Sequence, residues 1–103
     1  RSFCYVDDMI QGLICAMDSD YLFPINLGNP EEISIRELAK KVCFNLNKVE
    51  NLKFSELPDD DPIHRKPCIK VAMKQLNWQP KISLNNGLKK TINYFTNHFS
   101  NGV

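Results

Sequence analysis

The sequence predicts a small α/β fold, in which short strands alternate with helices. Three observations indicate it. A β-prone run at residues 1–6 comes directly before an amphipathic pattern at 7–18, and a second β-prone run at 21–27 comes before another amphipathic pattern. Helical patterns fill most of the last third of the chain. Because a strand, a crossover helix and a second strand form a right-handed unit, the strands are expected to be parallel.

The first predicted helix follows the run R-S-F-C-Y-V. Asp7 is expected to be its N-cap, because a carboxylate there accepts hydrogen bonds from free backbone N–H groups. Gly12 in the middle of a helix costs up to about 1 kcal/mol relative to alanine, so it indicates close packing. Five apolar residues recur at helical spacing and predict the buried face, namely Met9, Ile10, Leu13, Ile14 and Met17.

The second predicted strand covers residues 21–27, where Pro24 confines the first half to a sheet edge or an entry. Ser34 and Glu37 then form a capping box, which predicts the start of a helix that ends near Asn47. Residues 52–57 alternate well enough to predict a third strand. The apolar stripe of the helix consists of Ile35, Leu38, Ala39, Val42, Cys43 and Leu46.

Two helices are predicted in the last third of the chain. The first covers residues 69–76, with Asn77 following it as the residue that ends the helix. Trp78 is expected to fold back onto the core. Ser83 is expected to cap a final helix that ends near His98. The inward positions of the first of these helices are Ile69, Ala72, Met73 and Leu76, and those of the second are Leu84, Leu88, Ile92 and Phe95.

Length and charge narrow the possible classes of protein. With 103 residues, the chain forms at most one small domain. Its 13 basic and 12 acidic residues leave a net charge of +1, which argues against a nucleic-acid or anionic-membrane partner. No apolar run approaches the roughly 20 residues that span a bilayer. The four cysteines have no zinc-like spacing, so free thiols in a reducing compartment are expected.

A stiffened loop at residues 56–70 is the predicted ligand-binding segment. Pro62 and Pro67 lack an N–H group and restrict the residues before them, so the loop cannot be the interior of a helix. Arg65 lies between them, where a planar guanidinium suits the two parallel hydrogen bonds of a diphosphate or carboxylate. The alternative is a solvated turn in which acids and bases neutralise each other.

The chain lacks the residues of a complete catalytic site. A dinucleotide site needs a Gly-rich turn between strand and helix, and the four glycines are scattered. None of the three tyrosines is followed four residues later by lysine, and no Ser/His/Asp set has a known spacing. The acids at 59–61 are interpreted as an exposed turn and not as a metal site. His64 is expected to face solvent, and His98 to sit favourably at a helix C-terminus.

The chain resembles the UDP-glucuronate decarboxylases, or UDP-xylose synthases, of the extended short-chain dehydrogenase/reductase superfamily. The pairing of N-P-E-E with D-D-P and R-K-P is more particular to these enzymes than the other motifs. The matching segments cover nearly the whole chain in the family's order: R-S-F-C-Y-V-x-D-M at 1–9, I-N-L-G-N-P-E-E at 25–32, L-P-x-D-D-P at 57–62, R-K-P at 65–67, L-x-W-x-P-K at 76–81 and G-L-K-K-T-I-x-Y-F at 87–95.

This resemblance implies that residues 1–103 are the C-terminal substrate-binding portion of an extended Rossmann-type fold. The NAD-binding core and the Tyr-x-x-x-Lys pair would lie outside the chain, whose opening on Arg1 suggests a piece of something longer. In such enzymes NAD⁺ oxidises C4 of UDP-glucuronate, the resulting β-keto acid loses CO₂, and NADH returns the hydride to give UDP-xylose. The fragment alone is therefore expected to bind and not to turn over substrate.

The resemblance also implies which residues contact the UDP-sugar. Arg1 and Arg65 match arginines that reach the phosphates, and Arg65 is further expected to stabilise charge in the decarboxylation step. Tyr5 is expected to line the nucleotide pocket. Cys68 stands where most members have an aspartate near the ribose, and a thiol is a weaker hydrogen-bond acceptor. A strand end at Asn26 and Gly28 supplies two further candidates.

Two other functions are compatible with the sequence. One is a nucleotide-sugar 4-epimerase or 4,6-dehydratase of the same superfamily, and the other is a non-catalytic module that binds a nucleotide sugar. The full-length protein is expected to be a homodimer. It is expected in the cytoplasm, or in the Golgi lumen if a preceding segment carries a membrane anchor.

Overall fold

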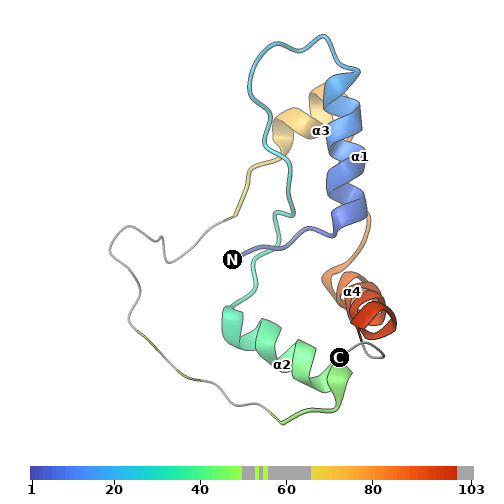
Figure 1. The fold of residues 1–103 in the computed structure, drawn as a ribbon. Helices are drawn as coiled ribbons and strands as arrows, with labels where there is room; N and C mark the ends of the chain where they lie inside the picture. The colour runs from blue at the N-terminus through green and yellow to red at the C-terminus, as the bar shows by residue number, and fades with distance from the viewer. Residues whose placement is uncertain (50–52, 54, 56–65, 100–103) are drawn as a thin grey trace.

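A computed structural model of the chain, which describes residues 1–49, 53, 55 and 66–99, contains four α-helices in those ranges (Figure 1). These are α1 (Val6–Met17), α2 (Ile35–Leu46), α3 (Lys70–Leu76) and α4 (Leu84–Phe99). The helices pack in two pairs, α1 with α3 and α2 with α4. Because each pair joins segments far apart in sequence, the fold depends on contacts between the two ends of the chain. None of these helices is both long and apolar enough to cross a membrane.

The strands predicted at 1–6 and 21–27 are absent: these residues are extended, turn or helical, and within the described ranges no residue is in a strand. One pair of backbone hydrogen bonds joins the first of these segments, at Arg1, to Ile33. The Ile33 N–H donates to the Arg1 carbonyl over 2.8 Å, and the Arg1 amino group donates to the Ile33 carbonyl over 3.2 Å. A strand needs a continued ladder of such bonds, and no second rung is formed here. The strand predicted at 52–57 falls almost wholly outside the described residues.

The helix ends follow the predicted signals more closely. The Ser34 hydroxyl accepts a hydrogen bond from the Glu37 N–H over 3.0 Å, as the capping box predicts. Asn47 and Asn77 both adopt the left-handed conformation just after a helix, with φ of 54° and 51°. The N-cap of α1 is Tyr5 and not Asp7, because helical geometry already begins at Val6.

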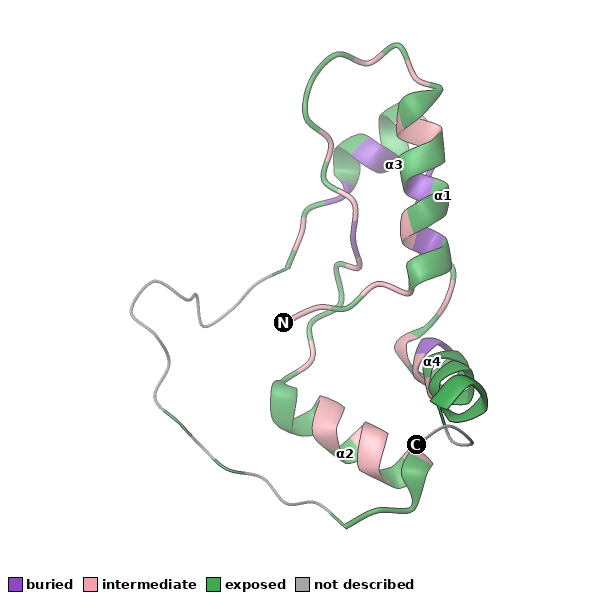
Figure 2. Cartoon of the chain, viewed as in Figure 1, coloured by how far each residue is buried: buried purple, intermediate pink, exposed green. Residues whose placement is uncertain are grey.

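The buried centre of the structure is a cluster formed where residues 69–78 meet α1. Ile69, Ala72 and Trp78 are its buried members, and Figure 2 shows that buried positions also lie on α1. The Trp78 indole Nε1–H donates to the backbone carbonyl of Asp8 over 3.0 Å. The prediction that Trp78 folds back onto the core is therefore confirmed.

The buried carboxylate of Asp8 fastens the turn after Trp78 to the start of α1. Its Oδ2 accepts hydrogen bonds from the backbone N–H groups of Lys81, over 3.0 Å, and Ile82, over 2.9 Å. A buried carboxylate is costly unless it is hydrogen-bonded, and here two otherwise unpaired donors satisfy it.

The prediction for the buried face of α1 is wrong. Ile10, Leu13, Ile14 and Met17 are exposed, whereas the residues turned inward include Asp8 and Gly12. The reason is space: a Cβ atom at position 12 would lie 3.0 Å from Trp78 Cε2 and 3.1 Å from Leu27 Cδ1. Only the side of the helix with the smallest residue can approach the indole so closely, which confirms close packing at Gly12.

The other apolar stripes are buried only in part. In α3, Ile69 before the helix and Ala72 are buried as predicted, but Met73 is exposed. In α2 and α4 the centres of the stripes are half-buried, while Ile35, Leu46 and Phe95 are exposed. Helical spacing therefore identified which residues share a face, but the described chain covers those faces incompletely.

Cys4 lies against the buried cluster, and its surroundings keep its thiol protonated. Burial raises the pKa of the Cys4 thiol, and the nearby Asp8 carboxylate raises this pKa further by repelling a thiolate. The Cys4 Sγ–H donates to the Tyr5 carbonyl over 3.6 Å. Cys15, Cys43 and Cys68 are also free thiols.

Replacing Asp8 with alanine is expected to destabilise the fold by about 2–4 kcal/mol, because two backbone N–H groups lose their acceptor. Urea unfolding followed by the fluorescence of Trp78, the single tryptophan, measures this. Asp7→Ala is the matched control, since Asp7 is the exposed neighbour in the same first turn and shares the interaction with the helix dipole. Equal losses in the two variants would contradict the role assigned to the Asp8 carboxylate.

Alkylation of Cys4 by iodoacetamide is expected to accelerate only above the ordinary thiol pKa of about 8.5, because the thiolate is the reactive form. Mass spectrometry of the Cys4 peptide against pH gives the midpoint, and the chain unfolded in urea is the reference. Because the folded pKa is the higher one, this thiol stabilises the fold below about pH 8.5 and loses that contribution as pH rises further. A folded midpoint at or below the unfolded one would refute this account.

Candidate functional site

The candidate residues that the sequence analysis considered fall into three groups. Arg65, His64 and the acids at 59–61 lie outside the described residues. Cys68 is exposed and accepts a hydrogen bond from Asn26 through its backbone carbonyl. Arg1 and Tyr5 are half-buried and lie in the segment before α1.

The turn at residues 26–28 packs directly against residues 67–68. The Asn26 Nδ2 amide donates to the Cys68 carbonyl over 3.4 Å, across 42 positions of sequence. A Cβ atom at Gly28 would lie only 2.7 Å from Pro67 Cγ, so any larger residue would push the two segments apart. We call Asn26, Gly28, Pro67 and Cys68 the junction. The junction brings together two of the motifs found in the sequence, and Arg65 lies two positions before Pro67 in the chain.

Gly28 matters because its missing side chain leaves room for Pro67, and not because its backbone adopts a conformation that only glycine favours. No glycine in the described ranges has a positive φ, so an ordinary backbone conformation suffices there. Gly28 is buried and Asn26 and Cys68 are exposed, so the junction has a packed floor and a polar, accessible surface. An accessible amide and an adjacent exposed Lys66 suit an anionic, hydrogen-bonding ligand.

Tyr5 lies apart from the junction partners. Its ring packs on α4, where a Cβ atom at Gly87 would lie 3.3 Å from Tyr5 Cδ1. It also lines a mostly apolar cavity of about 210 Å³ between the first segment, α2 and α4, together with Leu38, Val42 and Leu88. Arg1 joins Ile33 through the backbone. The role of both residues in binding a nucleotide stays a prediction.

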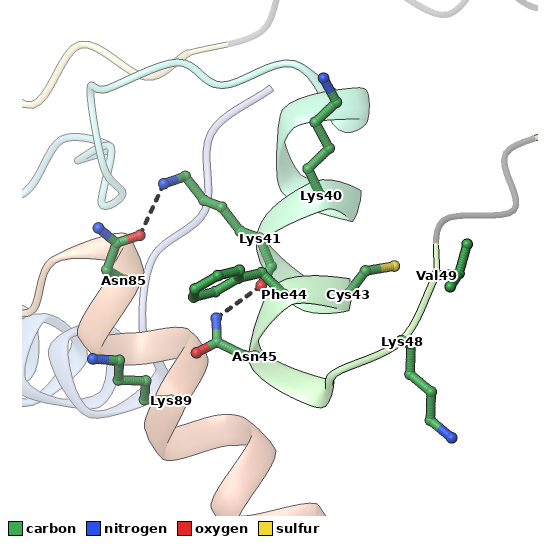
Figure 3. A pocket seen from close by; sticks show the side chains of 9 residues that line it. All are labelled: Lys40, Lys41, Cys43, Phe44, Asn45, Lys48, Val49, Asn85 and Lys89. Carbon is green, nitrogen blue, oxygen red and sulfur yellow. Dashed lines mark hydrogen bonds between the residues drawn. The ribbon is translucent and has the colours of Figure 1, made fainter.

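A basic groove of about 780 Å³ lies between α2 and α4, and the sequence reasoning missed it (Figure 3). Lys40, Lys41, Lys48 and Lys89 line it, and no carboxylate is among its described lining residues. The Lys41 ammonium donates to Asn85 Oδ1 over 3.0 Å, which joins the two helices. The signal was present in the sequence, because α2 and α4 together contain one acid, Glu37. The net charge of the whole chain is near zero, so it does not reveal that basic residues outnumber acidic ones on these two helices.

The groove has the charge to attract anions but few fixed donors to orient one. Figure 3 shows the lysine side chains spread around its rim, and Lys40, Lys48 and Lys89 are exposed. Exposed charges of this kind are well solvated and contribute little binding free energy each. The junction, whose backbone is fixed by packing, is therefore the stronger candidate for a specific site.

The described residues indicate no metal site, and Cys4 is no candidate nucleophile. No group of three or more metal-ligating side chains comes together among them. The raised pKa of Cys4 makes its thiol a poor nucleophile. What remains is a surface able to bind an anionic, hydrogen-bonding ligand.

Comparison with known proteins gives a consistent set of relatives, although no family model matches the chain. UDP-glucuronic acid decarboxylase 1 of Arabidopsis thaliana is 44% identical over 101 residues, which cover 98% of this chain and 23% of that protein. UDP-glucuronic acid decarboxylase 5 of the same plant is 47% identical over 88 residues, 85% of this chain and 26% of the relative. UDP-glucuronic acid decarboxylase 1 of Danio rerio is 41% identical over 96 residues, 93% of this chain and 23% of the relative.

The chain thus spans about a quarter of the length of the curated relatives that it matches, in their C-terminal portion. Such identity across plant and animal proteins extends over nearly all of its residues, and the resemblance inferred from the motifs is confirmed. Over nearly all of its length this chain is similar to a C-terminal portion of UDP-glucuronic acid decarboxylases from plants and animals.

Proposed function

We propose that this chain forms the substrate side of an NAD-dependent UDP-glucuronate decarboxylase, which converts UDP-glucuronate to UDP-xylose. The observation that carries the proposal is the junction, where the turn of the I-N-L-G motif packs against Pro67 and Cys68. The names of the relatives support decarboxylation over the 4-epimerase and 4,6-dehydratase alternatives.

In this proposal Arg65 binds the diphosphate of the substrate. It directly precedes Lys66 and Pro67, so packing of Pro67 on Gly28 anchors one end of the segment that carries it. The two parallel N–H donors of a guanidinium match the edge of a phosphate. Arg1 and Tyr5 are the further proposed contacts of the nucleotide.

Cys68 is proposed to face the ribose. Its backbone carbonyl already accepts the bond from Asn26, and its side chain is exposed. A thiol accepts hydrogen bonds only weakly, so a ribose hydroxyl gains less here than from a carboxylate at the same position. The proposal is that this chain binds the nucleoside less tightly than a relative with aspartate.

The described residues do not fit NAD. A pyrophosphate cradle needs glycines that leave backbone N–H groups open, but Gly12, Gly28 and Gly87 each receive a neighbouring side chain. The cofactor, which supplies the reversible oxidation at C4, is therefore assigned to a Rossmann-type portion outside this chain. We further propose that the full-length protein is a homodimer and that it resides in the cytoplasm. Both proposals rest on the family resemblance.

The proposal is tested by placing this chain in Arabidopsis UDP-glucuronic acid decarboxylase 1, in exchange for the matching 101 residues. The chimaera is expected to release CO₂ and form UDP-xylose. Arg65→Ala is expected to lower kcat/KM at least tenfold, equivalent to about 1.4 kcal/mol. Arg36→Ala, an exposed arginine on α2, is the matched control and is expected to have no effect. Formation of a 4-epimer without CO₂ would favour the epimerase instead, and an unchanged Arg65→Ala enzyme would overturn the role of this arginine.

In the same chimaera, Cys68→Asp is expected to lower the KM for UDP-glucuronate several-fold, because a carboxylate accepts the ribose hydroxyl more strongly. Cys68→Ala is the control and is expected to leave the KM near its starting value. Steady-state kinetics with UDP-glucuronate separates KM from kcat. A higher KM in Cys68→Asp would count against the proposed position of this side chain near the ribose.

A further inference from the structure

The basic groove between α2 and α4 holds three ammonium groups that the proposed substrate site does not use. Within the described ranges, the ammonium groups of Lys40, Lys48 and Lys89 form neither a hydrogen bond nor an ion pair, and all three residues are exposed. Lys41, the fourth lysine of the groove, is bound to Asn85. Like charges gathered in this way repel each other and attract anions. The groove therefore carries a charge that a partner can neutralise.

The two walls of the groove are joined by a hydrogen bond that also orients a neutral donor. The Lys41 ammonium on α2 donates to Asn85 Oδ1 on α4 over 3.0 Å. Because a lysine can only donate, Oδ1 is the end of the Asn85 amide that faces it, and the Nδ2 end is left for a ligand. The Asn45 Nδ2 amide donates to the Lys41 carbonyl over 2.8 Å and holds a second polar side chain of the lining in place.

An exposed aromatic ring lies in the same groove. Phe44 is 83% exposed and Val49 is 92% exposed, and both line the groove together with the lysines. Figure 3 shows the ring of Phe44 among the lysine side chains. Covering such a ring with another apolar side chain is favourable, so the groove suits a ligand that has both apolar and anionic groups. A free phosphate or a simple carboxylate has no apolar group to offer.

The groove is long enough for a short stretch of polypeptide. Since α2 has 12 residues, it is about 18 Å long at 1.5 Å per residue. An extended peptide rises about 3.3 Å per residue, so about five or six residues run the length of this helix. The lysines are spread around the rim of the groove (Figure 3). Carboxylates at intervals along a peptide can reach several of them, whereas a single phosphate cannot.

Two other classes of polyanion suit this groove less well. An anionic bilayer is flat on the scale of one helix, so it meets the rim of a groove before its lining. A nucleic-acid duplex presents phosphates and sugars at its surface, and these offer Phe44 no apolar side chain. The net charge of +1 also gives the chain no broad basic footprint for either of them.

We propose that the groove between α2 and α4 binds an acidic peptide segment of another protein, in which aspartates or glutamates flank an aromatic or aliphatic residue. The carboxylates pair with Lys40, Lys48 and Lys89, and the apolar residue covers Phe44. Exposed ion pairs are individually weak and are screened by salt, so this contact is reversible and depends on ionic strength. It goes beyond the proposed function and requires nothing of the junction.

The experiment measures the binding of a labelled peptide to the whole 103-residue chain by fluorescence anisotropy. The peptide is about eight residues long and has one phenylalanine between two runs of glutamate. Binding is expected to weaken at least tenfold when NaCl is raised from about 50 mM to about 300 mM, which roughly halves the screening length. A peptide with lysine in place of every glutamate is expected not to bind. An acidic peptide that does not bind, or a basic one that binds equally well, would overturn the proposal.

Charge reversal in Lys40→Glu/Lys89→Glu is expected to weaken binding of the acidic peptide at least tenfold. Lys70→Glu/Lys74→Glu is the matched control, because it makes the same change in net charge at two exposed lysines of α3 and is expected to cost less than threefold. If the fluorescence of Trp78 shows that the first variant is unfolded, Lys40→Gln/Lys89→Gln replaces it, with an expected loss of at least fivefold. Equal losses at the two pairs of lysines would contradict binding in the groove.

The apolar contact is tested separately. Phe44→Ser is expected to weaken binding several-fold at both salt concentrations, because salt does not screen the contact of the ring. Phe23→Ser removes an exposed phenylalanine outside the groove and is the matched control, with no expected effect. If Phe44→Ser binds the peptide as the wild type does, the groove recognises charge alone and the proposed occupant is wrong.

Other occupants give different results in the same assay. Anionic phospholipid vesicles or duplex DNA that bind more tightly than the peptide, and lose binding in Lys40→Glu/Lys89→Glu, would replace the peptide as the partner. Self-association of the chain at low salt, abolished by the same variant, would make a second copy the occupant. Either result defeats the proposal.

A final comparison separates the groove from the proposed substrate site. UDP is expected not to displace the peptide, and Arg65→Ala is expected to leave the affinity for the peptide unchanged. Displacement by UDP would place the peptide in the substrate site and overturn the proposal. Because the groove and the substrate site have different probes, failure of one leaves the test of the other intact.

Discussion

The attachment of the 78–82 turn to α1 is the constraint on which the described structure depends. Asp8 makes this attachment with two groups. Its backbone carbonyl accepts a hydrogen bond from the Trp78 indole, and its carboxylate accepts hydrogen bonds from the backbone N–H groups of Lys81 and Ile82. These bonds link positions 70 or more residues apart. Because few side chains are buried among the residues that the structure describes, this polar contact positions α1, α3 and the start of α4 where an ordinary small domain would use a larger core.

Three glycines serve as contact points in the same arrangement. Gly12 receives Trp78, Gly28 receives Pro67 and Gly87 receives Tyr5, so each joins two segments distant in sequence. The absence of a Cβ atom sets how closely these segments approach. The middle contact holds Pro67, two residues after Arg65 in the sequence, against the turn at residue 26.

The same packing leaves the chain with two kinds of surface. One is polar and accessible, at the junction and along the basic groove, and the other is apolar, along the outer face of α1. The chain matches about a quarter of the length of its relatives. The incomplete burial of α2 and α4 is consistent with this division.

The sequence by itself determined the four described helices, most of their ends and the resemblance to UDP-glucuronic acid decarboxylases. Helical spacing and caps are local, so Ser34, Asn47 and Asn77 could be interpreted without knowledge of the fold. It also placed the candidate residues of the junction, because motifs carry family information. Only the tertiary structure decided which face of α1 is buried and whether residues 1–6 and 21–27 pair as strands. Periodicity shows that Ile10 and Met17 share a face, but what covers that face depends on distant partners, and a strand exists only where a neighbouring strand supplies its hydrogen bonds.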